Sequence, residues 1–313
     1  MVDKSGYPKV IVLLLNWNGR DLMKDSCESY LNNDYPNFEV VMIDNGSTDD
    51  SVDYVKTNFP GVIILRNERN LGYSGGFNVG LNYAFNQNNA DYVLISNNDV
   101  KADHKVISEL VKVAESDDTI GFATGKVFYY DHPNILQTVG KKSDPVRWNG
   151  GDIGVREEDR GQYDEISERE FADDIYTLVR KKLYRKIGGY NTTFFLQCEE
   201  YDWQARAKKK GYRIMFTPFA KIWHKDSMTL GKTSPLKSYY DARNPMIVIL
   251  KHKSPDYFRK YFWLHLRKDV FKGSIKVILK GLEIIKAYKM WMGFFSGILW
   301  GIKNKLFTIR HFI

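Results

Sequence analysis

Residues 92–103 read YVLISNNDVKAD, and the first half of this stretch has the character of a buried β-strand. Tyr92 to Ser96 are mostly apolar, and the run ends abruptly in Asn97, Asn98 and Asp99. A short apolar run bounded by polar residues is typical of a strand that is covered on both faces. The three polar side chains can accept hydrogen bonds or bind a metal, so the end of this strand is a candidate site.

The first 130 residues repeat this pattern, with apolar strands that alternate with helical segments. We expect four strands, at residues 10–15, 39–43, 62–65 and 92–96, and a helix after each of them. Such alternation predicts an α/β fold with a mainly parallel sheet flanked by helices. Residues 141–172 are polar and rich in Gly, Asp, Glu and Arg, which predicts a long loop, either a functional lid or a disordered segment.

Composition limits the class of protein. With 313 residues, of which 43% are hydrophobic, the chain can bury a large core in one domain or in one domain with an appendage. Two cysteines, Cys27 and Cys198, cannot form a disulfide framework, which favours a reducing compartment. The apolar run at 10–15 has no cleavage site beside it, so we expect a strand there and no signal peptide. The longest apolar stretch, residues 290–302, is shorter than the roughly 20 residues that span a bilayer.

The positive charge is concentrated at the C-terminal end. Residues 251–313 hold 14 Lys and Arg against 3 Asp and Glu, a net charge of +11, whereas the rest of the chain has a net charge of −3. Cations alternate there with Trp, Phe, Leu and Ile at helical spacing. This pattern suits amphipathic helices on an anionic membrane surface, and helices that pack on the main domain or form an oligomer interface are the alternative. We therefore predict one domain over residues 1–250 and a basic amphipathic helical region over residues 251–313.

Polar side chains follow all four predicted strands. In open α/β sheets, ligands bind outside the carboxyl ends of the strands. The four strands lead in turn to Asn16 and Asn18, to Asp44 and Asn45, to Asn70, and to Asn97, Asn98 and Asp99. The segment NLGYSGGFNVG (70–80) adds Gly72, Gly76 and Asn78. Its glycines could let the backbone approach a phosphate at a helix N-terminus, or could serve a tight turn with close helix–sheet packing.

Several motifs together resemble the family 2 glycosyltransferases of the GT-A fold, in the branch similar to rhamnosyltransferases and galactofuranosyltransferases. They occur in family order over about residues 9–245 and read LLLNWNG, EVVMIDNGSTDDSV, NERNLGYSGGFNVGLNYA, VLISNNDV, KIGGYNTTFFLQCEEYDWQARAKKKGYRI, TPFAKIWH and YYDARN. The resemblance implies a GT-A domain, Rossmann-like, with a mainly parallel sheet. It also implies inverting, metal-dependent transfer of a sugar from dTDP-rhamnose or a UDP-sugar to a hydroxyl of a lipid-linked sugar or surface glycan.

The resemblance assigns roles to the strand ends. Asn97, Asn98 and Asp99 occupy the family's D-x-D-like motif, with an amide in place of the first carboxylate. Asp99 and His224, the latter in KIWH, would hold Mg²⁺ or Mn²⁺ on the donor diphosphate. Asp44 would contact the nucleotide base, with Asn16 and Asn18 lining its pocket. The remaining residues expected to border the donor site are Asn45, Asn70, Gly72, Gly76, Asn78, Asn97 and Asn98.

The acidic cluster in CEEYDW (198–203) is the candidate for the catalytic base. An inverting transfer needs a carboxylate to take the proton of the acceptor hydroxyl. The family pattern E-D-x-D places Glu200 in that role, with Glu where the family has Asp. One helix turn puts Glu199 and Asp202 on the same face, so both neighbours remain candidates. Acidic residues also favour the positive end of a helix dipole, which is the purely structural explanation.

Two other classes of protein compete with this interpretation. A dehydrogenase would need G-x-G-x-x-G directly after the first strand, and NWNGRD does not match it. A catalytically weakened sugar-nucleotide-binding or membrane-binding relative is the main alternative, because Asn97 and Glu200 both depart from the family pattern. The expected partners are a nucleotide sugar, a glycan or lipid-linked acceptor and an anionic membrane, without nucleic acid. The expected location is the cytoplasm, peripheral on the inner face of the cell membrane.

Overall fold

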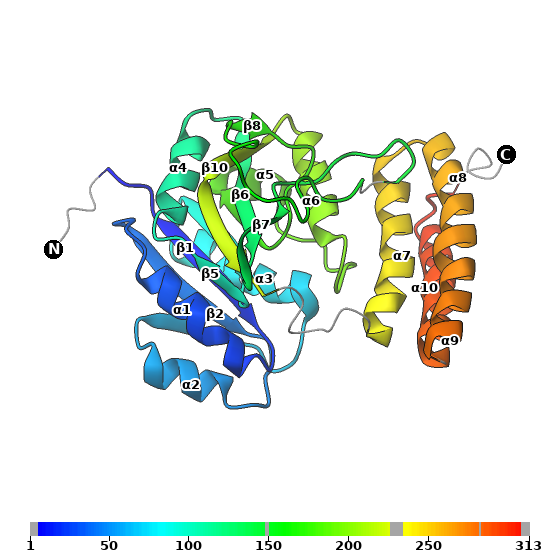
Figure 1. Ribbon diagram of the computed structural model, residues 1–313, viewed down its shortest axis with the longest axis horizontal. Coiled ribbons are helices and arrows are strands. Elements are labelled where there is room, and N and C mark those ends of the chain that lie inside the picture. The colour runs from blue at the N-terminus through cyan, green and yellow to red at the C-terminus, as the bar shows by residue number, and fades with distance from the viewer. Residues whose placement is uncertain (1–5, 148–149, 226–233, 282, 308–313) are drawn as a thin grey trace. The chain divides into compact units, whose positions relative to one another are not determined.

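The computed structural model describes residues 6–147, 150–225, 234–281 and 283–307 (Figure 1). The chain divides into two compact units. The first takes residues 1–142, 151–195 and 203–229, and the second takes residues 143–150, 196–202 and 230–313. The predicted division at residue 250 therefore falls inside helix α7 (Pro235–His252), which belongs to the second unit.

The first unit is built on one sheet of ten strands in the order β3-β2-β1-β4-β9-β6-β10-β5, with β7 beside β6 and β8 beside β10. The four predicted strands are confirmed as β1 (Val10–Asn16), β2 (Phe38–Asp44), β3 (Val62–Arg66) and β4 (Tyr92–Asn97). They pair in parallel, and the register sets Asn16 beside Asp44 and Leu15 beside Asn97. The carboxyl ends of these strands therefore meet at one edge of the sheet.

The remaining strands make the sheet mixed. They are β5 (Val100–Ala102), β6 (Ile120–Tyr129), β7 (His132–Thr138), β8 (Ser167–Glu168), β9 (Tyr176–Arg180) and β10 (Arg213–His224). β9 runs antiparallel to both β4 and β6, and β5 runs antiparallel to β10. β9 follows the long segment after β7, whose described residues form no crossover helix, so nothing there forces β9 into the parallel direction.

Helices cover both faces of the sheet. They are α1 (Met23–Leu31), α2 (Ser51–Asn58), α3 (Gly72–Asn82), α4 (Val106–Glu115), α5 (Lys181–Ile187) and α6 (Glu199–Lys208). Val12 of β1 packs in one core layer with residues of α1, α2 and α4. Ile11 and Leu13 pack in the opposite layer with residues of α3, α5 and α6. This alternation along β1 is what a strand covered on both faces requires.

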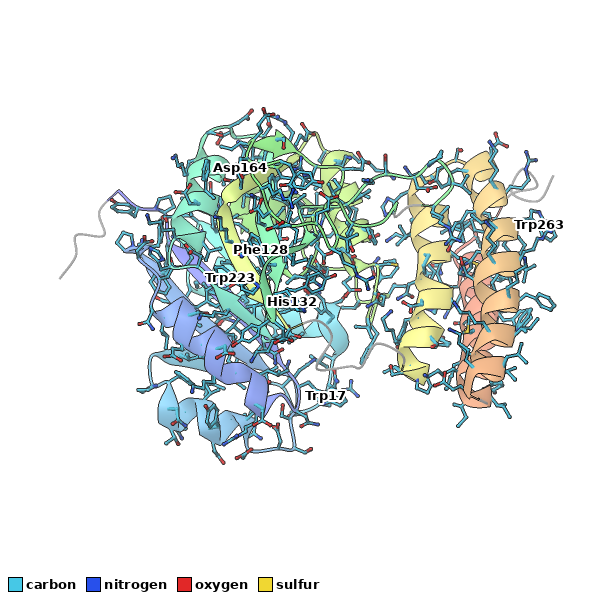
Figure 2. The ribbon with its side chains drawn as sticks, in the orientation of Figure 1. Trp17, Phe128, His132, Asp164, Trp223 and Trp263 are labelled. Atoms are coloured by element: carbon cyan, nitrogen blue, oxygen red, sulfur yellow. The ribbon has the colours of Figure 1, made fainter. Side chains whose placement is uncertain are left out.

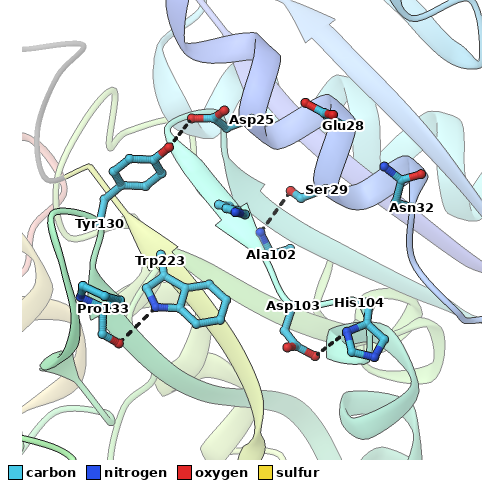
Figure 3. A pocket seen from close by; sticks show the side chains of 11 residues that line it. Asp25, Glu28, Ser29, Asn32, Ala102, Asp103, His104, Tyr130, Pro133 and Trp223 are labelled. Carbon is cyan, nitrogen blue, oxygen red and sulfur yellow. Dashed lines mark hydrogen bonds and ion pairs between the residues drawn. The ribbon is translucent and has the colours of Figure 1, made fainter.

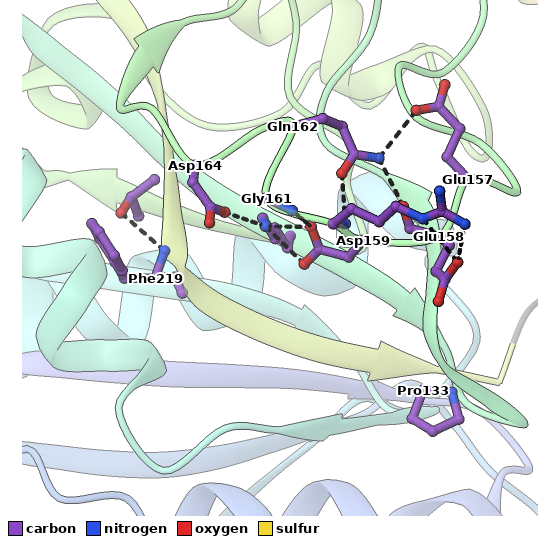
Figure 4. A network of polar contacts seen from close by, with 12 residues as sticks. Pro133, Glu157, Glu158, Asp159, Gly161, Gln162, Asp164 and Phe219 are labelled. Carbon is purple, nitrogen blue, oxygen red and sulfur yellow. Dashed lines mark hydrogen bonds and ion pairs between the residues drawn. The ribbon is translucent and has the colours of Figure 1, made fainter.

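The long segment after β7 is attached to the sheet through a buried lysine. Lys126 of β6 is only 1% exposed, and its ammonium donates to both carboxylate oxygens of Asp159 at 2.8 Å and to Asp164 at 2.6 Å (Figure 4). A buried ammonium is tolerated only when it is paired. Two residues further along β6, Phe128 stacks on Trp223 of the neighbouring strand β10, with ring centroids 5.8 Å apart (Figure 2).

The second unit is helical. α7 is followed by α8 (Pro255–Leu264), a π-helical stretch (His265–Lys272), α9 (Gly273–Gly281) and α10 (Ile284–Lys303). Ser234 caps α7 and Ser254 caps α8, and a proline follows each cap, which is a favoured way to begin a helix. Of the described helices, none is both long and apolar enough to cross a membrane.

Glycines bring α10 close to α7. A Cβ built on Gly293 would lie 2.1 Å from the carbonyl oxygen of Tyr239, and one on Gly297 would lie 2.4 Å from the Cε of Met246. No other residue type fits at this separation. The Tyr239 hydroxyl also donates to Ser296 Oγ at 2.8 Å. The C-terminal helices are therefore packed against α7 and form one bundle with it.

Candidate functional site

Buried amide side chains join the carboxyl ends of β1 and β4. Asn98 Nδ2 donates to Asn16 Oδ1 at 3.0 Å, and Asn16 Nδ2 donates to Ser47 Oγ at 3.2 Å and to Ser51 Oγ at 3.0 Å. Gly19 makes room for this contact, because a Cβ there would lie 2.7 Å from both amides. The two predicted residues Asn16 and Asn98 are thus brought together, and the amide hydrogens of Asn16 hold the segment after β2 in place.

Asn18 lies next to this network in a left-handed conformation, with φ of 50°. Its side-chain oxygen accepts from the backbone N–H of Thr48 at 2.7 Å and of Asp49 at 3.3 Å. Asn and Asp adopt this conformation more readily than other residues with a Cβ. Asn18 therefore fixes the start of the 47–50 segment relative to β1.

A second set of amides shapes the glycine segment. Asn45 Nδ2 donates to Asn70 Oδ1 at 3.0 Å and to the carbonyl of Gly72 at 3.1 Å, and Asn70 Oδ1 also accepts from the backbone N–H of Gly72 at 2.8 Å. Gly72 has φ of +74°, and a Cβ there would lie 2.4 Å from the carbonyl oxygen of Phe195. Glycine is required at this position because both the backbone conformation and the available space exclude a side chain.

Two predicted donor-site residues are engaged in packing. A Cβ on Gly76 would lie 2.4 Å from Leu15 Cδ1, so this glycine lets α3 approach β1. Asn78 donates from Nδ2 to the Tyr190 carbonyl and accepts the Tyr190 N–H at Oδ1, both at 2.9 Å. Its side chain joins α3 to the segment after α5. Their predicted role at the donor therefore stays a prediction.

Asp44, at the end of β2, has a carboxylate oxygen with spare hydrogen-bonding capacity. The residue is fully buried, and Oδ1 accepts from the backbone N–H of Ser47 at 3.3 Å. Oδ2 has Arg66 Nε at 3.4 Å but accepts no hydrogen bond from any residue that the structure describes. A buried oxygen of this kind is rare unless a partner is missing.

Asp99 and His224 converge at the same edge of the sheet. β5 pairs with β10 so that Val100 lies opposite His224, and Asp99 directly precedes Val100. Asp99 Oδ1 lies 3.1 Å from His224 Nε2, and both side chains are buried. Within the described residues, Oδ1 accepts no hydrogen bond in spite of this short distance.

Gln137 of β7 orients the ring of this histidine. Its Oε1 lies 2.9 Å from His224 Nδ1, and an amide oxygen can only accept. Nδ1 therefore carries a hydrogen, which leaves Nε2, beside Asp99 Oδ1, as the ring nitrogen that can bind a metal. A divalent cation bound by both Nε2 and Oδ1 would satisfy these two buried atoms. The donor set, one carboxylate and one imidazole oriented by a third residue, fits a divalent metal.

The predicted acidic cluster forms the first turn of helix α6, and these residues, up to Asp202, belong to the second unit. Glu199 is 4% exposed, and its Oε2 accepts no hydrogen bond from the described residues. Burial, and then the negative charge of Glu200, raise the pKa of the Glu199 carboxyl well above its usual range. Glu200 itself is half-buried. Of the two glutamates, Glu200 is therefore the more exposed to solvent.

Asp202 has a structural environment. It is fully buried, and its Oδ1 lies 2.9 Å from His252 Nε2 and also pairs with Lys251 Nζ. Both partners are on α7. The contacts of this carboxylate with two basic groups attach the start of α6 to α7.

A separate pocket of about 790 Å³ lies between α1 and the ends of β5 and β10 (Figure 3). Asp25 and Glu28 line it from α1, and Tyr130 and Trp223 line it from the opposite side. Lys225, next to His224 in sequence, pairs with Asp25 at 2.6 Å and donates its backbone N–H to the carbonyl of Asp99 at 2.9 Å. None of the predicted site residues lines this pocket.

The family model described as "Glycosyl transferase family 2" matches residues 10–188. The chain belongs to this family. Among curated relatives, the low-salt glycan biosynthesis hexosyltransferase Agl10 of Haloferax volcanii is 23% identical over 211 residues, 66% of this chain and 65% of its own length. The poly-beta-1,6-N-acetyl-D-glucosamine synthase of Staphylococcus aureus is 24% identical over 227 residues. That match covers 71% of this chain and 51% of the synthase, so the chain spans about half to two thirds of these two relatives.

Solved structures of glycosyltransferases have the same fold. The mannosyltransferase PcManGT from Pyrobaculum calidifontis, in complex with GDP-Man and Mn²⁺, matches with a TM-score of 0.56 and 14% identity, over 97% of this chain and 89% of that one. GalNAc-T7 with UDP, GalNAc and Mn²⁺ matches with a TM-score of 0.64 and 13% identity, over 96% and 58% of the two chains. The predicted GT-A-like α/β fold is confirmed. The narrower rhamnosyl and galactofuranosyl branch stays a prediction.

Sequence reasoning missed three residues that shape the site. Gln137 lies in a segment with no strand signal, and only the β6–β7 pairing brings it to His224. Gly19 follows β1 in NWNG, where a glycine after a strand could have been taken as a sign of close approach. Asn244 was within the matched motif YYDARN, but nothing in that motif showed which segment it contacts.

The raised pKa of Glu199 predicts a pH-dependent stability. Below the usual glutamate pKa the carboxyl is protonated in both states, but as the pH rises only the unfolded chain releases the proton readily, so the wild-type protein loses stability. We expect Glu199→Gln to raise the melting temperature at pH 8 by about 2 °C or more, since one pKa unit corresponds to about 1.4 kcal/mol. The gain should vanish near pH 4. Thermal unfolding from pH 4 to 8 tests this, and an equal effect at all pH values would contradict it.

Proposed function

We propose that this protein transfers a sugar from a nucleotide-diphosphate donor to a hydroxyl of a glycan or lipid-linked sugar, with inversion at the anomeric carbon. One observation carries the proposal most strongly. In a chain of glycosyl transferase family 2, Asp99 Oδ1 and His224 Nε2 face each other in a buried site at the carboxyl edge of the parallel strands. Such an edge is where α/β sheets bind their ligands.

The donor base is proposed to pair with Asp44. Its buried Oδ2 has no hydrogen bond from the described residues, so it can accept one from a ring N–H of uracil or thymine. The Asn45–Asn70–Gly72 contacts shape the adjacent loop at the N-terminus of α3, which suits a negatively charged diphosphate. A UDP-sugar or dTDP-rhamnose meets these requirements. Solved relatives with UDP or GDP-Man support a nucleotide-sugar donor in general.

Asp99 and His224 are proposed to hold Mg²⁺ or Mn²⁺, with Gln137 fixing the imidazole. When bound, the cation would supply positive charge that stabilises the departing diphosphate. The mannosyltransferase and GalNAc-T7 structures contain Mn²⁺, which supports this choice. Asn97 stands where the D-x-D-like motif has its first carboxylate. Asp99 is therefore the one carboxylate that the motif would contribute to the metal.

Glu200 is proposed as the base. The acceptor oxygen attacks the anomeric carbon, the bond from that carbon to the diphosphate oxygen breaks, the diphosphate leaves with the electron pair, and Glu200 takes the acceptor's proton. Its neighbours are less suitable. Burial raises the pKa of Glu199 and so disfavours its ionised form, and Asp202 is held by Lys251 and His252.

Substitution of either metal-site residue should abolish metal-dependent donor binding. We expect the wild-type protein to gain about 4 °C or more in melting temperature with UDP or dTDP and Mn²⁺, because a ligand at about 100 times its Kd stabilises the folded state by about 2.7 kcal/mol. Asp99→Ala and His224→Ala should lose the part of the gain that needs Mn²⁺. Asp103→Ala, a nearby carboxylate outside the site, is the matched control. If the gain in melting temperature depends on Mn²⁺ in both site variants as it does in the wild type, the assignment of Asp99 and His224 as metal ligands is wrong.

Loss of the base should separate binding from transfer. Glu200→Gln keeps the side-chain size and removes the basic carboxylate, so donor binding should persist while transfer falls by about 100-fold or more. Sugar transfer and donor binding are measured on the same preparation, with Glu199→Gln and Asp202→Asn alongside. Near-normal transfer by Glu200→Gln would move the role elsewhere. A wild-type protein that binds the donor but neither transfers nor hydrolyses it would favour the catalytically weakened relative.

The protein is also proposed to bind anionic lipid surfaces through α9 and α10, on the cytoplasmic face of the membrane. Six large apolar residues of α10 are 40% to 66% exposed at alternating spacings of three and four: Ile285, Tyr288, Met292, Phe295, Leu299 and Ile302. On α9, the exposed Ile275 and Leu279 alternate with Lys276 and Lys280. No ion pair of these lysines occurs among the described residues. A second copy would oppose like charges, whereas an anionic membrane gains up to about 1 kcal/mol per cation.

Vesicle binding tests this surface. The full-length protein should sediment with anionic liposomes at low salt, and the double variant Leu279→Ser/Leu299→Ser should sediment several-fold less. Ile166→Ser, which changes an exposed apolar residue of the first unit, is the control. Truncation is unsuitable here, because it would uncover the face of α7 that packs on α10. If the wild-type protein stays in the supernatant, and light scattering shows a dimer that the double variant dissociates, the surface binds a second copy instead.

A further inference from the structure

The segment before Glu199 has an unusual backbone. Gln197 has φ of 71° and Cys198 has φ of 70°, so two consecutive residues with side chains are in the left-handed conformation. Single residues other than glycine visit this region occasionally, and two in a row are strained. Strain of this kind persists only where the surrounding structure enforces it, and it is common at functional sites. The enforcing contacts come from α7, in the same unit.

Asn244 of α7 contacts this turn directly. The residue is fully buried, and its Nδ2 donates to the carbonyl oxygens of Leu196 at 2.7 Å and Gln197 at 2.9 Å. Its Oδ1 accepts from Arg243 at 2.6 Å, which fixes the orientation of the amide. Both hydrogens of the Asn244 amide are therefore used to hold two successive carbonyls of the strained turn.

Asp202 fastens the other end of the same segment. Its carboxylate is held by Lys251 and His252, two turns further along α7, and its backbone N–H donates to the carbonyl of Cys198 at 3.2 Å. α7 therefore holds the segment 196–202 at both ends. The two carboxylates Glu199 and Glu200 lie between these two attachments.

We infer that Asn244 is a positioning residue that enforces the left-handed turn at Gln197–Cys198 and thereby sets the direction in which Glu199 and Glu200 point. Asn244 makes no contact with the reacting groups in this role and acts through the turn. α10 packs on α7 at Gly293 and Gly297 and so helps to hold α7 in place. The catalytic part of this inference rests on the proposed function, but the structural part does not.

Cys198 reports on the turn independently of catalysis. It is half-buried, and burial, followed by the charges of Glu200 and Glu199, raises the pKa of its thiol well above the usual range. Such a thiol reacts slowly with a maleimide, and release of the turn should speed its reaction. Cys27, the other cysteine, is buried in the first unit and has a thiol pKa raised to about 12 by burial, so it serves as an internal reference.

The experiment compares full-length wild-type protein with Asn244→Ala and with Lys237→Ala. Lys237 is on the same helix and forms an exposed pair with Asp241. We expect Asn244→Ala to speed maleimide labelling of Cys198 by about 10-fold or more through local opening, with Cys27 unchanged. Transfer should show a kcat lower by about 10- to 100-fold with an unchanged KM for the donor, because only the base is misdirected. Lys237→Ala should match the wild type in both assays.

Glycine at the strained position supplies the decisive test. Glycine adopts the left-handed conformation without strain, so Gln197→Gly added to Asn244→Ala should restore much of the kcat and slow the labelling again. If the alanine variant does not fold, Asn244→Ser, which retains a shorter donor, takes its place in the same comparison. Labelling of Cys198 that is unchanged by loss of Asn244, or no recovery with glycine, overturns the inference. A lack of transfer by the wild-type protein would refute the proposed function alone, and the labelling would still decide the role of Asn244.

Discussion

The antiparallel pairing of β5 with β10 is the contact on which the site depends. Three residues of β5 suffice to set Val100 opposite His224, and this register carries Asp99 to within 3.1 Å of the imidazole. β7 then supplies Gln137, which fixes the hydrogen on Nδ1. Without that pairing, the D-x-D-like motif would be a turn after β4, and His224 would be a residue at the end of a distant strand. The asparagine contacts at the ends of β1, β2 and β4 hold the neighbouring loops around the same edge.

The second unit has a role in this account that goes beyond a basic surface. Its helix α7 holds the acidic segment by Asn244 at one end and by Lys251 and His252 at the other. α10 packs on α7 through glycines, and the outer side of α10 exposes a stripe of large apolar residues. α7 therefore holds the segment that carries the carboxylates, and α10, which packs on α7, carries the exposed apolar residues proposed above to bind lipid. Removal of α10 would uncover the face of α7 against which it packs.

Local sequence signals were sufficient for the parallel half of the sheet. Val10–Asn16, Phe38–Asp44, Val62–Arg66 and Tyr92–Asn97 are apolar runs that end in polar residues, and each is found as predicted within two residues. The antiparallel strand β9 was not predicted, because its place between β4 and β6 is set by pairing between distant segments. The same is true of Gln137. Asn78 and Gly76 show the opposite case, since a motif shared with a family of transferases also contains residues whose observed contacts are packing contacts.

The acidic segment shows the same limit. The family resemblance favoured Glu200, but sequence spacing left Glu199 and Asp202 as candidates, and burial and pairing distinguish the three. The left-handed turn before them could not be foreseen, because neither Gln197 nor Cys198 is a residue type that favours positive φ.

Calorimetric titration of UDP and dTDP into the full-length protein, with Mn²⁺ and with a chelator in its place, tests the central claim most directly. The claim is that the edge formed by Asp44, Asp99 and His224 binds a nucleotide diphosphate together with a divalent cation. The account predicts saturable binding of at least one of the two nucleotides with Mn²⁺, weakened by about 10-fold or more in the chelator, because the diphosphate then loses its counter-charge. Equal affinity with and without the metal, or no binding of either nucleotide, would contradict it.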